Sequence, residues 1–367
     1  MTSEEYLHTA FLLAKRANSR AIRPNPFVGA IIVDQNGEII GEGYHQKAGE
    51  AHAEVIAINN ALLKTNDLSK CTLYVTLEPC SHTGKTPPCT SLILEHKIPK
   101  VVIGSMDPNP LVSGEALLTD RGVKVEICIL PEIVELNNIF NINQLNKRPK
   151  YILKAATTVN GKIADRFGNS KWISNEKSRA YVHQILRSNA DAILTTAKTV
   201  IKDNASMNIR LPASEPRELN LIIIDKQLDI LKEENKSLGI YYQRNNTKIY
   251  LVTNKIYPYL LPENFEIINV EINNDEIDLV QLSDILLSKN ICVVLIEAGG
   301  KLNASLIKQK FIDEINLFIC PSIIIDNDGI SIFSSTELQE IEKSIQLSLI
   351  EAQTFDNDIM LKYKVLF

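Results

Sequence analysis

Short apolar runs alternate with stretches of helical spacing along the whole chain, and this alternation constrains the fold more than any other feature. The first half predicts strands over residues 27–33, 39–44, 73–76 and 100–105, and helices over 4–18, 53–64, 91–96 and 131–143, with a helix–strand pair over 112–128. A tight turn at 34–37 joins the first two strands. Such alternation is typical of an α/β domain, a sheet covered by helices.

A polar, proline-containing segment at residues 147–150 divides the chain, so we expect one domain over 1–147 and a second over 148–367. The second half again alternates. Residues 229–247 are polar, and we expect them to form a surface excursion. Strands are predicted at 151–157, 190–194, 220–225, 248–253, 266–270, 291–297 and 314–320, and helices at 175–188, 277–289 and 302–310.

Charge and hydropathy exclude several classes of partner. The chain carries 39 Lys and Arg against 44 Asp and Glu, a net charge of −5, without a basic block that could grip a phosphate backbone. We therefore expect no nucleic-acid partner. The apolar runs are too short to span a bilayer, and the first residues lack the pattern of a signal peptide. We expect a cytoplasmic protein with no membrane partner.

The most informative residues are His52 and Glu54 and, further on, the segment 78–80, Glu-Pro-Cys, with Cys89. One imidazole and two thiolates form a three-ligand set suited to zinc and leave the fourth tetrahedral position for water. A lone histidine or a lone Pro-Cys pair is usually structural, but the combination indicates a catalytic metal site. An open position lets the metal lower the pKa of its water to roughly 7.

Glu54 is two residues from His52, which is too close for both to share the metal comfortably. In a helix interior, residues two apart point about 200° apart. Only at a first turn, with the metal just beyond the helix end, can both face one site. There Glu54 would carry protons between the water and a substrate.

These residues match the signature of zinc nucleobase deaminases, although eight residues rather than two separate the cysteines here. Residues 24–29, 49–54, 77–89 and 107–110 resemble the bifunctional riboflavin-biosynthesis deaminase/reductase family. The resemblance implies a cytidine-deaminase-like three-layer domain. It also implies zinc-dependent deamination of 2,5-diamino-6-(5-phosphoribosylamino)pyrimidin-4-one, with Glu54 as the proton carrier. The substrate pocket it implies is lined by Asn25, His45, His82, Lys85, Asp107 and Asn109.

The residue types suit those roles, but other interpretations stay open. An asparagine can pair with a donor and an acceptor on a pyrimidine edge, and Lys85 could hold a ribose phosphate. His45 and His82 could instead be solvated loop residues, and Asp107 and Asn109 could serve turns beside proline. The segment 113–116 departs from the family pattern and shortens a surface helix.

The second half is similar to the family's reductase portion, which resembles dihydrofolate reductase in its α/β fold. The resemblance implies reduction of the ribosyl chain to ribityl by NADPH, with the protein orienting the reactants. The NADPH contacts it implies are Ala156, Trp172, Thr199, Asp203, Gly299, Gly300 and Ser305. The substrate contacts it implies are Lys154, Ser170, Arg187, Met207, Arg210 and Glu297. Plain alternatives are core packing for Trp172, surface positions for the arginines, and a simple strand-to-helix turn for the glycine pair.

The reductase half departs from the family at several positions. Thr196 and Lys198 replace the glycines of a loop in which backbone passes close to the cofactor, Asn160 replaces a carboxylate, and Lys226 replaces a small hydroxyl residue. A glycine is also replaced within residues 321–325. The lysines could instead contact cofactor phosphates.

Three function hypotheses follow. The leading one is a bifunctional enzyme that acts on a phosphorylated pyrimidine; the family implies a homodimer or homotetramer. A second is an active deaminase whose reductase-like half has lost hydride transfer and serves binding or oligomerisation. A third, a nucleic-acid deaminase, predicts a basic groove, which the acidic balance disfavours.

Overall fold

The computed structural model describes residues 1–81, 87–210, 218–244, 246–335 and 340–367. The chain forms two compact units, Met1–Lys147 and Arg148–Phe367. None of the described helices is long and apolar enough to cross a membrane.

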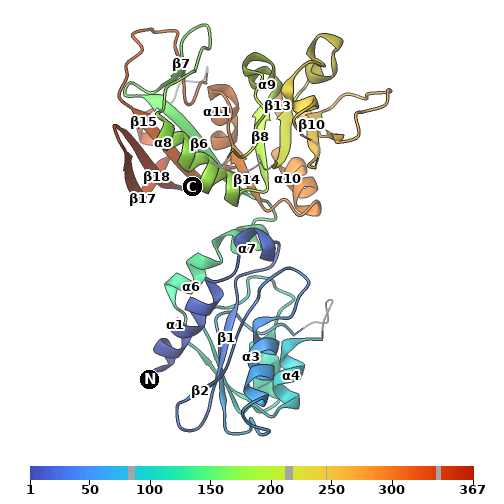
Figure 1. Cartoon of the computed structure of the whole chain (residues 1–367), viewed down its shortest axis with the longest axis vertical. Helices are drawn as coiled ribbons and strands as arrows, with labels where there is room; N and C mark the ends of the chain where they lie inside the picture. The colour runs from blue at the N-terminus through green and yellow to red at the C-terminus, as the bar shows by residue number, and fades with distance from the viewer. Residues whose placement is uncertain (82–86, 211–217, 245, 336–339) are drawn as a thin grey trace. The chain divides into compact units, whose positions relative to one another are not determined.

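The first unit is built on one mixed sheet (Figure 1). β1 pairs antiparallel with β2 and β3, whereas β3, β4 and β5 are parallel. The strands, in sheet order, are β2 (Ile39–Tyr44), β1 (Gly29–Val33), β3 (Thr72–Val75), β4 (Lys100–Ile103) and β5 (Lys124–Ile127). The helices are α1 (Ser3–Ala14), α2 (Ser19–Ile22), α3 (Ala53–Leu62), α4 (Cys89–Glu95), α5 (Gly114–Asp120), α6 (Pro131–Leu136) and α7 (Asn138–Leu145).

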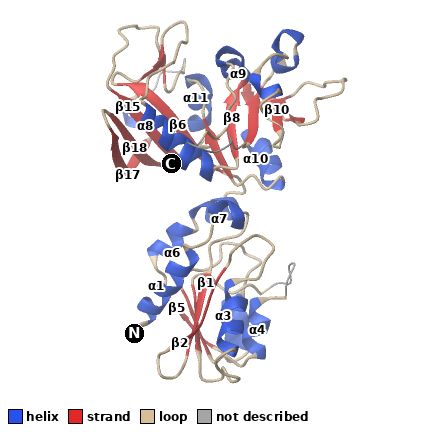
Figure 2. Ribbon diagram, viewed as in Figure 1, coloured by secondary structure: helices blue, strands red, loops and turns tan. Residues whose placement is uncertain are grey.

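Both faces of this sheet are covered by helices, as Figure 2 shows. Successive strand side chains point to opposite faces, so β1 contributes to two separate cores. Ile31 and Val33 join the core that contains α1 side chains, whereas Ala30 and Ile32 join the core that contains α3 side chains. The result is the three-layer arrangement that the family resemblance implies.

Two glycines bring α3 directly against β2. A Cβ added at Gly43 would lie 2.4 Å from the carbonyl oxygen of Ala53, and one at Gly41 would lie 2.1 Å from that of Ala57. Any larger residue would push the helix away from the strand. These contacts fix the position at which α3 begins, and hence the position of the residues in its first turn.

The second unit contains a longer sheet. Seven neighbouring strands, β11, β10, β9, β8, β14, β6 and β15, run parallel to one another; β18 pairs antiparallel with β15, and β17 pairs antiparallel with β18. Its order is β11 (Phe265–Asn269), β10 (Ile249–Thr253), β9 (Asn220–Ile224), β8 (Ala192–Thr196), β14 (Val293–Ile296), β6 (Lys150–Thr158), β15 (Glu314–Cys320), β18 (Asp358–Leu366) and β17 (Gln346–Phe355). The helices are α8 (Glu176–Tyr181), which continues as a π-helical turn over Val182–Arg187, α9 (Ala197–Asp203), α10 (Leu279–Ser288) and α11 (Gly300–Lys308). Short strand pairs join β7 (Lys162–Ala164) to β16 (Ile330–Ser331) and β12 (Ile272–Asn273) to β13 (Glu276–Ile277).

Two expectations about local structure are wrong. The helix expected over 131–143 is two helices separated at Asn137, whose buried side chain accepts a hydrogen bond from the Phe27 amide at 2.8 Å and donates one to the Phe27 carbonyl at 3.0 Å. Residues 229–247 do not form a mere surface excursion. Ile230 and Ile240 are buried in the core beneath β9 and β10, which secures the segment to the sheet.

Candidate active sites

Three metal-ligating side chains of the first unit converge. His52 is the N-cap residue of α3, Cys89 is the first residue of α4, and Cys80 lies in the loop after β3. The Nδ1 atom of His52 lies 3.2 Å from Cys89 Sγ and 3.6 Å from Cys80 Sγ. The three ligand atoms all lie within 4.8 Å of one another.

This set fits a zinc ion. Zinc binds imidazole nitrogen at about 2.0–2.1 Å and thiolate sulfur at about 2.3 Å in a tetrahedron, so donors less than 5 Å apart can share one ion. The Cys89 amide donates a hydrogen bond to Cys80 Sγ at 3.2 Å. The Cys89 side chain and then His52 also hydrogen-bond to this sulfur, and together these contacts lower the pKa of Cys80 to about 4 despite its burial. A lowered pKa favours the thiolate form of Cys80, which is the form that binds zinc.

Glu54 occupies the first turn of α3 and is 3 % exposed. Burial raises the pKa of its carboxyl group, an effect that the nearby His52 opposes. His52 at the N-cap and Glu54 two positions later have the first-turn placement that lets both serve one site. A buried carboxyl with a raised pKa is suited to accepting and releasing protons.

His45 contacts Asn25, the Ala51 backbone and the His52 ring. Its Nδ1 atom lies 3.1 Å from the Ala51 carbonyl oxygen, and its Nε2 atom lies 3.0 Å from Asn25 Nδ2. The partners assign the proton to Nδ1, so Nε2 accepts from the amide. Burial lowers the pKa of His45, which favours the neutral ring. The His45 and His52 ring centroids are 5.8 Å apart.

Of the remaining predicted pocket residues, the structure describes only Asp107 and Asn109. Asp107 and Asn109 each stabilise a turn: Asp107 Oδ1 accepts from the Asn109 amide at 2.8 Å, and Asn109 Oδ1 accepts from the Leu111 amide at 3.1 Å. Both side chains thus form the turn hydrogen bonds that the sequence analysis gave as an alternative role. His82 and Lys85 lie outside the described residues.

The sequence marks Glu78 as part of an informative segment but assigns it no role. It is 6 % exposed and accepts hydrogen bonds from the backbone amides of Asp107 at 3.2 Å and Glu115 at 3.0 Å. Because Glu78 is two residues before Cys80, it ties the metal-binding loop to the loop that carries Asp107. Its place immediately before Pro-Cys was the available signal.

In the second unit, Arg187 and Glu297 form a two-point ion pair. Arg187 Nε lies 2.6 Å from Glu297 Oε1, and Nη2 lies 2.8 Å from Oε2. Burial raises the pKa of Glu297, but the charge of Arg187, its hydrogen bonds and the nearby Lys154 and His183 together lower the pKa to about 2. Arg187 is 8 % exposed, so it is not the surface residue that a lone arginine usually is.

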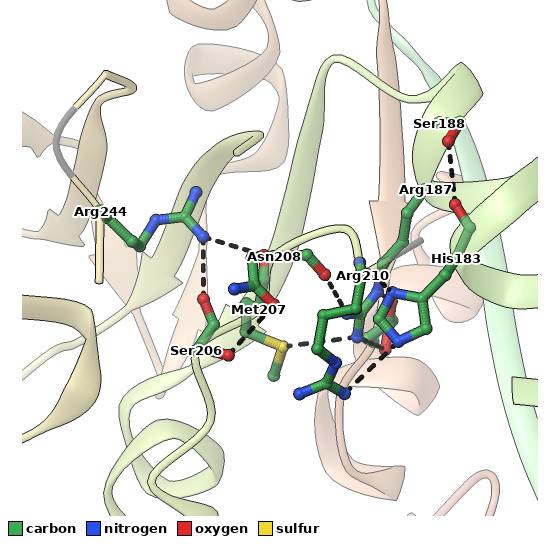
Figure 3. Close-up of polar contacts among 9 residues, drawn as sticks. His183, Arg187, Ser188, Ser206, Met207, Asn208, Arg210 and Arg244 are labelled. Carbon is green, nitrogen blue, oxygen red and sulfur yellow. Dashed lines mark hydrogen bonds and ion pairs between the residues drawn. The ribbon is translucent and has the colours of Figure 1, made fainter. Parts of the chain in front are cut away.

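Two other predicted substrate residues, Met207 and Arg210, lie near this pair. Met207 Sδ lies 4.0 Å from Arg187 Nη2, and the Arg210 amide donates a hydrogen bond to His183 at 3.0 Å (Figure 3). The sequence did not assign His183 to the site. Burial lowers the pKa of Lys154 on β6, which faces the opposite charge of Glu297. Ser170 lies half-buried in the loop between β7 and α8.

The predicted cofactor residues come from the ends of several elements. Gly299 is the N-cap of α11, and a Cβ there would meet no atom within 4 Å, so the backbone borders open space. A Cβ on Gly300 would lie 2.2 Å from the Ser331 carbonyl oxygen. Trp172 is 70 % exposed, which contradicts core packing, and its ring lies 4.5 Å from the Arg179 guanidinium carbon. The other members are Ala156 on β6, Thr199 and Asp203 on α9, and Ser305 on α11.

A helix N-terminus that borders open space suits the phosphate groups of a dinucleotide such as NADPH. Three of the departures from the family are locally accommodated. Thr196 caps α9 by accepting from the Thr199 amide at 3.3 Å. Asn160 donates to the Ile324 carbonyl at 2.8 Å, and Lys226 pairs with Asp275 at 2.8 Å. Lys198 is exposed on α9.

Comparison with known proteins places both units in one family. Residues 1–105 match the model of the cytidine and deoxycytidylate deaminase zinc-binding region, and residues 149–361 match that of the RibD C-terminal domain. The chain is 34% identical to riboflavin biosynthesis protein RibD of Aquifex aeolicus, over 98% of each chain. It is 36% identical to RibD of Actinobacillus pleuropneumoniae, over 100% of this chain and 96% of that one.

Solved structures agree. One is from Thermotoga maritima and is described as a diaminohydroxyphosphoribosylaminopyrimidine deaminase/5-amino-6-(5-phosphoribosylamino)uracil reductase. It superimposes on this chain with a TM-score of 0.82 at 33% identity, over 99% of each chain. RibD of Acinetobacter baumannii gives a TM-score of 0.79 at 28% identity. These matches confirm the deaminase-like and reductase-like fold classes. The chain belongs to the RibD family of bifunctional riboflavin-biosynthesis deaminase/reductases.

Proposed function

We propose that the chain catalyses two successive steps on one phosphorylated pyrimidine. The unit 1–147 deaminates 2,5-diamino-6-(5-phosphoribosylamino)pyrimidin-4-one, and the unit 148–367 reduces the ribosyl chain of the product to ribityl with NADPH. The observation that carries the proposal is the convergence of His52, Cys80 and Cys89 at the helix start that also bears Glu54.

In the deaminase unit, His52, Cys80 and Cys89 hold the zinc, which when bound supplies Lewis-acid activation of a water molecule. The Glu54 carboxylate accepts a proton from the attacking water, passes it to the ring nitrogen, and then assists the departure of ammonia. The water oxygen becomes the new carbonyl oxygen. Burial supports this role because it raises the pKa of Glu54 toward that of a proton carrier.

Asn25 and His45 orient the pyrimidine. His45 Nε2 accepts a hydrogen bond from Asn25 Nδ2, and this fixes the direction of the asparagine amide. An oriented amide presents a defined donor and acceptor to a pyrimidine edge. We assign Asp107, Asn109, His82 and Lys85 to the same pocket on the basis of the family resemblance.

In the reductase unit, NADPH when bound supplies a hydride. We assign it to Gly299, Gly300, Ser305, Thr199, Asp203, Ala156 and Trp172. The substrate is assigned to Lys154, Ser170, Arg187, Met207, Arg210 and Glu297. The Arg187–Glu297 pair keeps both charges in fixed positions, and Arg210 offers a guanidinium to the substrate phosphate.

We also propose a cytoplasmic location and a homodimeric or homotetrameric assembly. All six cysteines are free thiols, and zinc binding requires Cys80 and Cys89 as thiolates, which supports a reducing compartment. Sedimentation velocity of the purified chain tests the assembly, and a monomer would contradict it.

Stepwise assays of the purified, zinc-loaded chain test the proposal. With the diamino substrate alone, mass spectrometry should find the deaminated product and an equivalent amount of ammonia. Addition of NADPH should then give steady NADPH oxidation and the ribityl product. Deamination without NADPH oxidation would instead support a reductase-like half that has lost hydride transfer, and activity on cytosine in DNA would revive the nucleic-acid alternative.

A further inference from the structure

Near the C-terminal end of the segment 229–247 lies Arg244, whose side chain is buried and only 1 % exposed. Its Nη1 atom donates hydrogen bonds to the carbonyl oxygens of Ser206 and Met207, both at 2.9 Å (Figure 3). Its Nη2 atom donates to Thr247 Oγ1 at 3.3 Å, and its carbonyl oxygen accepts from Asn264 Nδ2 at 2.7 Å. Arg244 is therefore anchored at its own backbone while its guanidinium binds a different loop.

That loop, residues 206–210, is held along its length by side chains from other elements. Beyond the two contacts with Arg244, Arg187 Nη1 donates to the Asn208 carbonyl at 2.6 Å, and His183 Nδ1 accepts from the Arg210 amide at 3.0 Å. Three successive carbonyl groups thus bind guanidinium groups. The backbone of the loop is fixed from outside.

The loop needs this support because its conformation is unfavourable on its own. Met207 has a φ of +47°, in the left-handed region that a residue with a side chain rarely adopts. Such a residue persists only when its surroundings hold it in place. Burial lowers the pKa of Arg244 to about 10, so the guanidinium is still a cation at neutral pH and donates strong hydrogen bonds.

We propose that Arg244 is a positioning residue of the reductase site, which sets where Met207 and Arg210 meet the substrate. The inference rests on the proposed reductase function of this unit. Arg244 acts through the backbone of the loop and does not touch the reacting atoms.

Two substitutions test the proposal. Arg244→Lys keeps the charge but loses the forked donor, and Arg244→Met removes both. We expect the KM for 5-amino-6-(5-phosphoribosylamino)uracil to rise roughly tenfold in the lysine variant and further in the methionine variant, because a small misplacement of binding groups is costly. The Kd for NADPH, measured by quenching of Trp172 fluorescence, and the deaminase rate should stay at wild-type values.

Arg148→Met is the matched control. Arg148 is a largely buried arginine that pairs with Asp313 at 2.7 Å and binds the Pro149 carbonyl, at the start of the same unit. Its removal should lower the unfolding temperature without changing the KM. If this control raises the KM as much as Arg244→Lys does, the role of Arg244 is merely structural and the proposal is overturned.

Amide hydrogen exchange gives a readout that does not depend on activity. Exchange at residues 206–210 should become faster in Arg244→Lys and Arg244→Met than in the wild type, and not in Arg148→Met. Unchanged exchange in both Arg244 variants would overturn the inference. A wild-type chain that does not oxidise NADPH would instead refute the proposed function, while the exchange data still decide whether Arg244 holds the loop. If Arg244→Met does not fold, Arg244→Lys carries both measurements.

Discussion

Glu78 offers a sharp test of how the deaminase site is held together. Glu78→Gln keeps the shape of the side chain but replaces one oxygen with an NH₂ group. Both carboxylate oxygens of Glu78 accept from backbone amides, of Asp107 at 3.2 Å and of Glu115 at 3.0 Å. In the variant, one of these amide donors must face another donor.

The size of the effect follows from these two bonds. A hydrogen bond to a charged group contributes about 1.5–3 kcal/mol, and a buried donor left unpaired costs about 1–3 kcal/mol. We expect the free energy that holds the Asp107 loop against Glu78 to fall by at least about 2 kcal/mol. If that loss appears fully in the transition state, kcat/KM for deamination falls about thirtyfold.

The assay compares Glu78→Gln with the wild type by deamination kinetics and zinc analysis. Zinc content should match the wild type because the ligands are retained, and NADPH oxidation with the deaminated substrate should not change. Glu115→Gln is the control, since it alters a carboxylate at the same place but keeps the backbone amide that Glu78 binds. Wild-type kcat/KM in Glu78→Gln, or an equal loss in the control, would refute the reasoning.

Three further predictions concern metal, packing and pH. Cys89→Ser should lower the zinc content of the purified chain, and full occupancy by metal analysis would mean a different ligand set. Gly43→Val should lower the unfolding temperature and weaken zinc binding together, because a Cβ at Gly43 lies 2.4 Å from the Ala53 carbonyl oxygen; an unchanged zinc titration would contradict this. Burial, aided by nearby cations, lowers the pKa of His183 from 6.5 to about 4. The unfolded state then binds more protons between these values, so the free energy of unfolding should fall as pH drops from 6.5 to about 4. In His183→Gln the fall over this range should be smaller, and an unaltered pH profile of chemical denaturation would exclude the effect.

The sequence predicts the alternating architecture and the convergence of the metal-ligating residues because both are encoded locally. Apolar periodicity predicts the strands. His52 and Glu54 can face one site only at the start of a helix, and in the structure they lie at the start of α3. Cys80 and Cys89 are only nine positions apart in the sequence, and Cys89 is the first residue of α4. No contact between distant segments is needed to recognise these features.

The features that the sequence does not reveal depend on contacts between distant residues. The break at Asn137 arises from its hydrogen bonds to Phe27, more than a hundred residues earlier. The burial of Arg244 depends on carbonyl groups of residues 206 and 207, which composition cannot show. The C-terminal hairpin of β17 and β18 was also missed, since no strand was predicted beyond residue 320.

The central claim is that one chain carries a deaminase that depends on Glu54 and a separate, working reductase. NADPH oxidation by the Glu54→Gln variant tests it most directly, with each of the two pyrimidines supplied in turn. The account predicts no oxidation with the diamino pyrimidine and the wild-type rate with 5-amino-6-(5-phosphoribosylamino)uracil. Wild-type oxidation with the diamino pyrimidine, or no oxidation with either compound, would contradict it.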